Sequence, residues 1–127
     1  MTTPTQTASA SLNRLLERLK REPETVMLDE ALGAIDNAYE FTPVAFTNGP
    51  LKHEAGDKVR SCAIYALGRL HGLSVPETLA CFGEHYREVL EDPAGDAHMT
   101  IRVFMKGGWA GVSHAAMPLK PRAQPRA

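Results

Sequence analysis

Apolar residues recur at intervals of three and four along most of this chain, in segments separated by proline or glycine. Residues 12–19 show the pattern first, with four leucines on one side and charged residues on the other. Similar spacing returns over residues 28–39, 59–71, 75–90 and 101–105. A period near 3.6 residues is typical of an amphipathic helix, because it places the apolar side chains on one face. The sequence therefore predicts an all-α domain in which four or five helices pack around one core.

The boundary between the third and fourth of these segments is the clearest in the chain. Gly72 suits the left-handed residue that commonly follows the last turn of a helix. Ser74 and Glu77 have the spacing of a capping box, in which each side chain satisfies a backbone N–H of the other residue. We expect the fourth helix to continue through residue 90, and Asp96 to cap the last helix.

Residues 41–56 interrupt the helical pattern. Pro43 and Pro50 punctuate them, and the pair Asn48-Gly49 favours a tight turn. The stretch is nevertheless too apolar for a free loop. We therefore expect one long ordered loop that its aromatic side chains hold against the core, without a partner strand that would predict a sheet.

The two ends of the chain differ in composition from its middle. Residues 1–10 carry no charge and four threonines, so they predict a disordered segment that has the character of a type III secretion signal. Residues 113–127 are rich in proline and predict a flexible, solvated tail. The helical domain is expected to span residues 11–112.

Composition restricts the functions that the chain can have. With 127 residues it is long enough for one domain, and its net charge of −1 does not favour nucleic-acid binding. Nothing approaches the roughly 20 consecutive apolar residues that cross a bilayer. The amino terminus lacks a basic and then apolar signal peptide, so we expect no cleaved signal. Cys62 and Cys81 lie in predicted helices and are expected to be reduced and buried, as in a cytoplasmic protein.

Candidate site residues gather around the interrupting loop. His53-Glu54 followed by Asp57 invites comparison with the H-E-x-x-H zinc motif, but an aspartate stands where the second histidine is required. A metal site there competes with a structural role, in which these polar groups satisfy nearby backbone donors. We expect Asn48, His53, Glu54 and His98 to be the residues that would surround a ligand pocket, with no catalytic residue, no metal and no cofactor assigned.

Two further patterns have a functional and a structural interpretation. Cys81 and His85 stand four apart on a helix, which can present two metal ligands on one side, but no second pair completes the set. Buried structural thiols are therefore the prediction. Trp109 is flanked by glycines and could anchor an interface, yet packing against Phe104 is favoured.

The order of several short motifs resembles the HopJ family of type III effectors, over about residues 26–112. The landmarks are Phe41-Thr-Pro43, Phe46-Thr-Asn-Gly49, Ala55-Gly56, Ser61-Cys62, His71-Gly-Leu73, Leu79-Ala-Cys-Phe-Gly83, Tyr86-Arg87, His98, Phe104-Met105 and Gly108-Trp109. The chain departs from that pattern at His53 and Arg60, where relatives tend to carry asparagine and glycine.

The resemblance implies a small protein that plant-associated bacteria secrete through a type III system into host cells. Its partners would be the secretion machinery and a host protein, and it would serve as a binding or interaction module. The family supplies no agreed catalytic residues. The alternative is a small metal- or ligand-binding, enzyme-like protein that stays in the bacterial cytoplasm.

Overall fold

The computed structural model describes residues 10–125, and this part of the chain folds into helices and short strands. The α-helices are α2 (Ala10–Arg21), α3 (Leu28–Ala38), α4 (Val59–His71), α5 (Val75–Ala80), α6 (Glu84–Glu91) and α7 (Met99–Gly107). Two 3-10 turns are η1 (Pro23–Thr25) and η2 (Gly108–Gly111). The strands are β1 (Tyr39–Phe41), β2 (Phe46–Asn48), β3 (Leu51–His53), β4 (Val112–His114) and β5 (Leu119–Pro121). The secretion-signal prediction for residues 1–10 lies outside the described residues, apart from Ala10.

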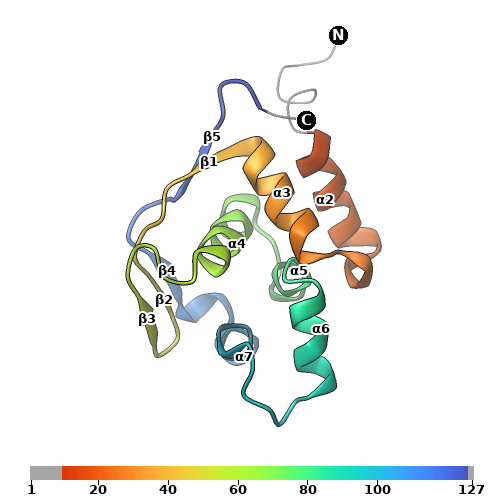
Figure 1. Ribbon diagram of the computed structural model, residues 1–127, viewed down its shortest axis with the longest axis vertical. Helices are drawn as coiled ribbons and strands as arrows, with labels where there is room; N and C mark the ends of the chain where they lie inside the picture. The colour runs from red at the N-terminus through yellow and green to blue at the C-terminus, as the bar shows by residue number, and fades with distance from the viewer. Residues whose placement is uncertain (1–9, 126–127) are drawn as a thin grey trace.

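The all-α prediction is wrong, because the described residues form two small antiparallel sheets beside the helices. β1 pairs with β5, and Glu40 lies opposite Lys120. In the second sheet β2 lies between β3 and β4, so that Phe46 faces His53 on one side and His114 on the other. The fold is therefore mixed α/β. Figure 1 shows both sheets along one flank of the helices.

The interrupting segment is ordered, as predicted, but it forms strands and not a loop. Strands β2 and β3 form a hairpin joined by the turn Gly49-Pro50, in which Gly49 has a φ of 58°. The outer partners β4 and β5 come from residues 112–121, the region that the sequence predicts as the start of a solvated tail. Each strand is only three residues long, so neither alternation nor β propensity could reveal the pairing.

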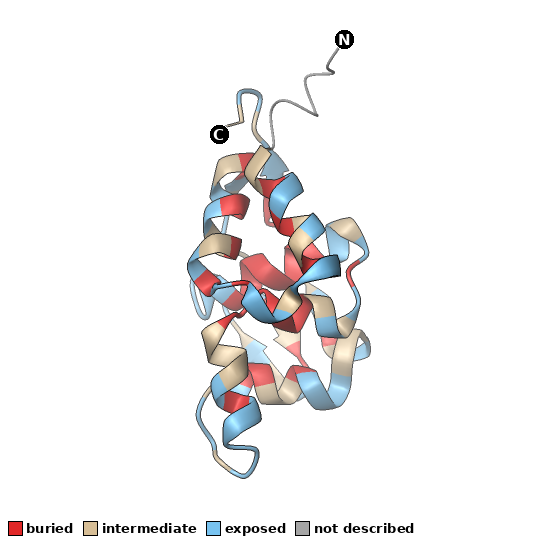
Figure 2. Cartoon of the chain, turned by 90° about the vertical axis from the view of Figure 1, so that its right-hand side faces the viewer, coloured by how far each residue is buried: buried red, intermediate tan, exposed pale blue. Residues whose placement is uncertain are grey.

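Helix α4 lies at the centre of the molecule, between α3, α5 and the sheets (Figure 1). Residues 61–68 are buried without interruption, which is unlike the one-sided burial of the outer helices. A helix that is buried on all sides must be apolar or small on all sides, and this stretch contains no charge. Figure 2 shows the same pattern, since the buried residues concentrate on the inner faces and in the central helix.

The predicted helix boundaries are partly confirmed. Gly72 ends α4 in the left-handed conformation with a φ of 63°, and Ser74 and Glu77 form the capping box. The helix predicted through residue 90 is instead divided in two, because α5 ends at Ala80 and a turn over residues 81–83 leads into α6. Gly83 closes that turn with a φ of 57°. The last helix is also capped differently, because α7 begins after His98 and not after Asp96.

Candidate functional site

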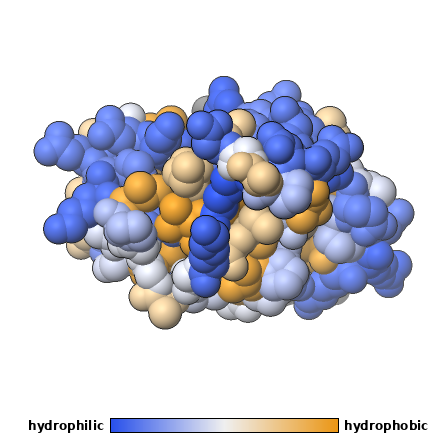
Figure 3. Space-filling model, turned by 90° about the horizontal axis from the view of Figure 1, so that it is seen from below, coloured by the Kyte–Doolittle hydropathy of each residue, from blue (hydrophilic) through white to orange (hydrophobic). Residues whose placement is uncertain are grey.

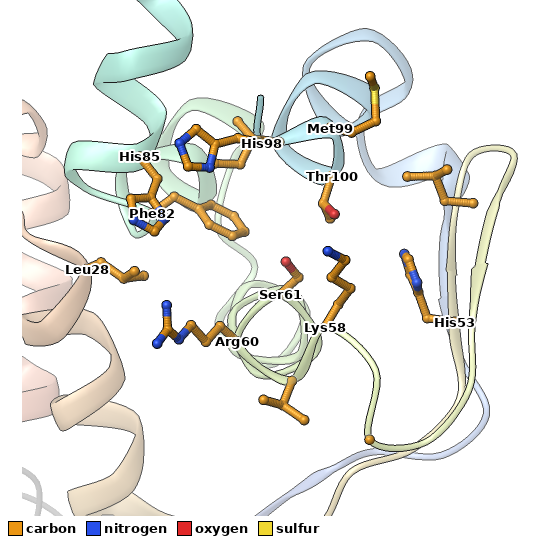
Figure 4. A pocket seen from close by; sticks show the side chains of 14 residues that line it. Leu28, His53, Lys58, Arg60, Ser61, Phe82, His85, His98, Met99 and Thr100 are labelled. Carbon is orange, nitrogen blue, oxygen red and sulfur yellow. The ribbon is translucent and has the colours of Figure 1, made fainter. Parts of the chain in front are cut away.

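A cavity of about 560 Å³ opens where the starts of α3, α4, α6 and α7 meet strand β3. Phe82, which follows α5, also lines it. Its volume falls within the range of roughly 300–1,000 Å³ that small-molecule sites occupy. Figure 4 shows the side chains that line it. They are Leu28, Leu51, His53, Gly56, Lys58, Val59, Arg60, Ser61, Phe82, His85, His98, Met99, Thr100 and Ile101.

Strained backbone marks two edges of this cavity. Lys58 and His98 are the described non-glycine residues with positive φ, at 49° and 56°. Each is the residue that precedes the first turn of a helix, Lys58 for α4 and His98 for α7. Left-handed backbone is unfavourable for such residues, and it persists where the surrounding structure holds it. Residues 58–61 and 98–101 line the cavity, so the amino-terminal ends of both helices lie beside it.

The cavity lining combines cationic, polar and apolar side chains. Lys58 and Arg60 contribute cationic side chains, and Ser61 and Thr100 contribute hydroxyl groups. No aspartate or glutamate is among the described lining residues. Glu84 stands close by, but its Oε1 accepts a hydrogen bond from the backbone N–H of Leu28 at 2.8 Å, and that bond lowers the pKa of the carboxyl group.

Three histidines border the cavity in different environments. The rings of His85 and His98 stack, with centroids 4.5 Å apart and planes inclined by 20°. Nε2 of His98 lies 3.4 Å from Oε1 of Glu88, so these groups form an ion pair whenever the histidine is protonated. The ring of His53 packs against Phe46 at 4.8 Å. Its Nε2 atom is buried and has no hydrogen-bond partner among residues 10–125.

The structure brings only two of the four predicted site residues to the cavity. His53 and His98 line it, whereas Glu54 is exposed and does not. Asn48 is buried behind it, where Nδ2 donates a hydrogen bond to the carbonyl oxygen of Thr100 at 2.9 Å. Asn48 thus ties the hairpin to the first turn of α7, whose residues line the cavity.

A buried tyrosine completes this link. The hydroxyl of Tyr65 donates to the same carbonyl oxygen of Thr100 at 3.2 Å, and Nδ2 of Asn48 lies 3.4 Å from that hydroxyl. Burial raises the pKa of Tyr65 well above its usual range, so it stays neutral. Central helix α4, strand β2 and helix α7 therefore share one hydrogen-bonded junction.

Sequence reasoning missed Lys58, Arg60, Ser61 and Thr100. No motif contains these four residues, which become neighbours only because α4 and α7 begin at the same place. The start of a helix after a left-handed lysine leaves no sequence signal, since lysine rarely adopts that conformation. His85 was considered only as a metal partner of Cys81.

Both cysteines lie inside the protein. Cys62 and Cys81 are buried and free, as predicted. Burial raises the pKa of the Cys81 thiol to about 12 and also raises the pKa of Cys62, which keeps both protonated. Within the described chain no group of three histidine, cysteine or acidic side chains could hold a metal ion.

A second, more apolar hollow of about 530 Å³ lies between α6 and α7. Leu90, Met99 and Met105 line it and are 52%, 47% and 39% exposed. Figure 3 views the molecule from below and shows apolar patches between hydrophilic side chains. Trp109 does not contribute to this surface, because it packs edge-on against Phe104 at 5.1 Å, as predicted.

These features define a small α/β domain that carries a cavity lined by cationic, polar and apolar side chains. Among residues 10–125 no helix is long and apolar enough to cross a membrane. The chain belongs to the HopJ type III effector protein family, whose model matches residues 12–119. The family resemblance read from the short motifs is thereby confirmed.

One solved structure gives the same fold. It is titled "Crystal structure of unknown function protein VPA0580" and matches with a TM-score of 0.85 and 38% sequence identity. The match covers 87% of this chain and 93% of that chain. No curated protein gives a significant match.

Proposed function

We propose that this protein is a type III effector-like binding module that holds a small ligand in the cavity between α4, α6 and α7. The cavity itself carries the proposal, because side chains from distant parts of the sequence converge on one volume of about 560 Å³. Family membership supports delivery into a host cell. The expected residues at the site are His53, Lys58, Arg60, Ser61, His85, His98 and Thr100.

Binding is favoured over catalysis by the state of the reactive groups. The two thiols are buried and held protonated, as described above. Groups that line the cavity instead supply charge, hydrogen-bond donors and apolar surface. Such a set orients a ligand without providing an activated nucleophile.

The cavity is tested by an NMR fragment screen on uniformly labelled protein. We expect hits to move the backbone amides of the first turns of α4 and α7. His85→Trp places a large ring on a cavity-lining, half-buried position of α6 and should abolish these shifts. Leu90→Trp on the same helix faces the other hollow and is the matched control. A screen with no hits at the cavity would remove the basis for this proposal.

Delivery needs a separate experiment. Residues 1–30 fused to a translocation reporter should enter host cells from a strain with a type III apparatus and not from one without it. Failure to enter would defeat the effector part of the proposal. A mutant phenotype that persists without the apparatus would favour the alternative, a role in the bacterial cytoplasm.

A further inference from the structure

The charges around the cavity determine what kind of ligand it can accept. Lys58 and Arg60 line it, and no described lining residue is acidic. A metal or an organic cation would find no carboxylate among these lining residues, although Glu88 lies 3.4 Å from the lining residue His98. An anion would find the positive charge of Lys58 on one side and that of Arg60, which extends toward Leu28, on the other (Figure 4). Charge-assisted hydrogen bonds to such groups are about twice as strong as neutral ones.

The two helix starts add donors at the same place. Neither α4 nor α7 has a side-chain cap or an acidic residue in its first turn. The first backbone N–H groups of each helix therefore have no side-chain acceptor, and the helix dipole adds partial positive charge there. Backbone N–H groups at a helix start that lack a side-chain acceptor are suited to a carboxylate or phosphate.

Three side chains complete the polar end of the cavity. Figure 4 shows Lys58 from the start of α4, Ser61 one turn on and Thr100 from α7 extending toward a common space, with His53 beside them. The buried Nε2 of His53 is without a partner in the described structure, although buried polar groups are normally hydrogen-bonded. Phe82 and Leu28 lie toward the other side of the cavity, where Arg60 also extends (Figure 4).

We propose that the cavity takes a small organic anion, whose carboxylate or phosphate lies between the first turns of α4 and α7 near Lys58 and whose apolar part lies against Phe82. This inference rests on the proposed ligand-binding function and names the ligand class. The volume is too large for an inorganic ion alone, so the apolar part contributes to affinity.

Three probe compounds separate the two parts of the ligand. Phenyl phosphate carries both parts, inorganic phosphate carries only the charge, and benzyl alcohol carries only the ring. Each is titrated into labelled full-length protein while the amides of Ser61 and Thr100 are followed by NMR. We expect phenyl phosphate to move both amides and to bind at least roughly tenfold more tightly than either other compound.

A matched pair of variants tests the charge. Lys58→Asn removes the cation but suits the left-handed backbone, because asparagine adopts it readily, so α4 should still start there. It should weaken phenyl phosphate binding by at least about fivefold. Lys52→Asn removes an equal charge from an exposed position of β3 outside the cavity, and it should change affinity by less than about twofold.

Arg60→Gln is a second test, at an exposed position that also lines the cavity. It should weaken the binding of phenyl phosphate by at least about threefold, so the test does not depend on one variant. Equal binding of benzyl alcohol and phenyl phosphate at the cavity would overturn the anion inference and leave the binding function standing. The anion inference would also fall, and the binding function would stand, if none of the three compounds moved the amides of Ser61 and Thr100 while the fragment screen found other hits at the cavity. Blank results in both experiments would remove the binding function as well.

Discussion

Asn48→Asp tests whether the hairpin holds the cavity wall in place through α7. Asn48 is 1% exposed, and its Nδ2 donates to the carbonyl oxygen of Thr100 at 2.9 Å. Aspartate has nearly the same shape but presents an oxygen in place of the donor. Two acceptors would then face each other inside the protein. The hydroxyl of Tyr65 has a single proton, so it can satisfy only one of them.

The magnitude follows from this geometry. A lost buried hydrogen bond removes about 1 kcal/mol, and an acceptor left without a donor costs about 1–3 kcal/mol more. We therefore expect Asn48→Asp to lower the free energy of unfolding by about 3 kcal/mol at neutral pH. Burial raises the pKa of the new carboxyl above its unfolded value, so the folded state resists ionisation. The stability loss should accordingly be small below about pH 4 and should grow as the pH rises toward 7.

Thermal unfolding followed by circular dichroism measures this effect. A loss of about 3 kcal/mol should lower Tm by roughly 10 °C at pH 7 in a chain of this size. Thr47→Ala is the control, because Thr47 is the neighbouring residue on the other face of β2 and its Oγ1 is 3.5 Å from the carbonyl oxygen of Gly111. Its Tm should fall by less than about 3 °C. An Asn48→Asp protein that melts within about 2 °C of the wild type, or whose deficit does not grow with pH, would refute this role of Asn48.

Three further predictions concern the backbone and titratable groups. Gly83→Ala should lower the free energy of unfolding by about 3 kcal/mol or more, because Gly83 has positive φ and a Cβ there would overlap the backbone at the start of α3. Gly33→Ala on α3, where a Cβ meets open space, should be neutral or slightly stabilising. Equal melting temperatures for the two variants would contradict this. Ser74→Ala should lose about 1 kcal/mol in urea unfolding through the broken capping box, and an unchanged midpoint would show that the box contributes nothing. Burial lowers the pKa of His71 and of His114, so the unfolded chain takes up protons first and stability should fall as the pH drops below about 6.5. Melting curves between about pH 7.5 and 5.5 should show this decline in stability. The double variant His71→Gln with His114→Gln should show a shallower decline. An equally steep decline in the double variant would mean that other groups cause it.

Local chemistry was enough to place most helices and several of their ends. The capping box at Ser74 and the left-handed Gly72 depend only on nearby residues, so they could be predicted. The break at Gly83 could not, because it depends on how closely α3 approaches that glycine. The strands were missed for a similar reason, since β4 and β5 find their partners some sixty to eighty positions earlier in the chain.

The candidate site, like the fold, could be predicted only in part from the sequence. His53 and His98 were predicted and do line one cavity, but Glu54 points elsewhere and Asn48 supports the wall from behind. The cationic residues of the cavity, Lys58 and Arg60, were not predicted, because in the sequence they cannot be distinguished from solvent-exposed charges elsewhere on the surface.

The sequence alone determined that the chain forms packed helices, where several of them stop, that its thiols are buried, and that it resembles its family. These properties follow from spacing and from local backbone preferences. Tertiary structure decided that two short sheets join the helices and that the starts of α4 and α7 meet at one cavity. The local β2–β3 hairpin escaped prediction because its strands are only three residues long. The pairings of β4 and β5 and the convergence of the helix starts depend on contacts between residues far apart in the chain, and those contacts leave no periodic signal in the sequence.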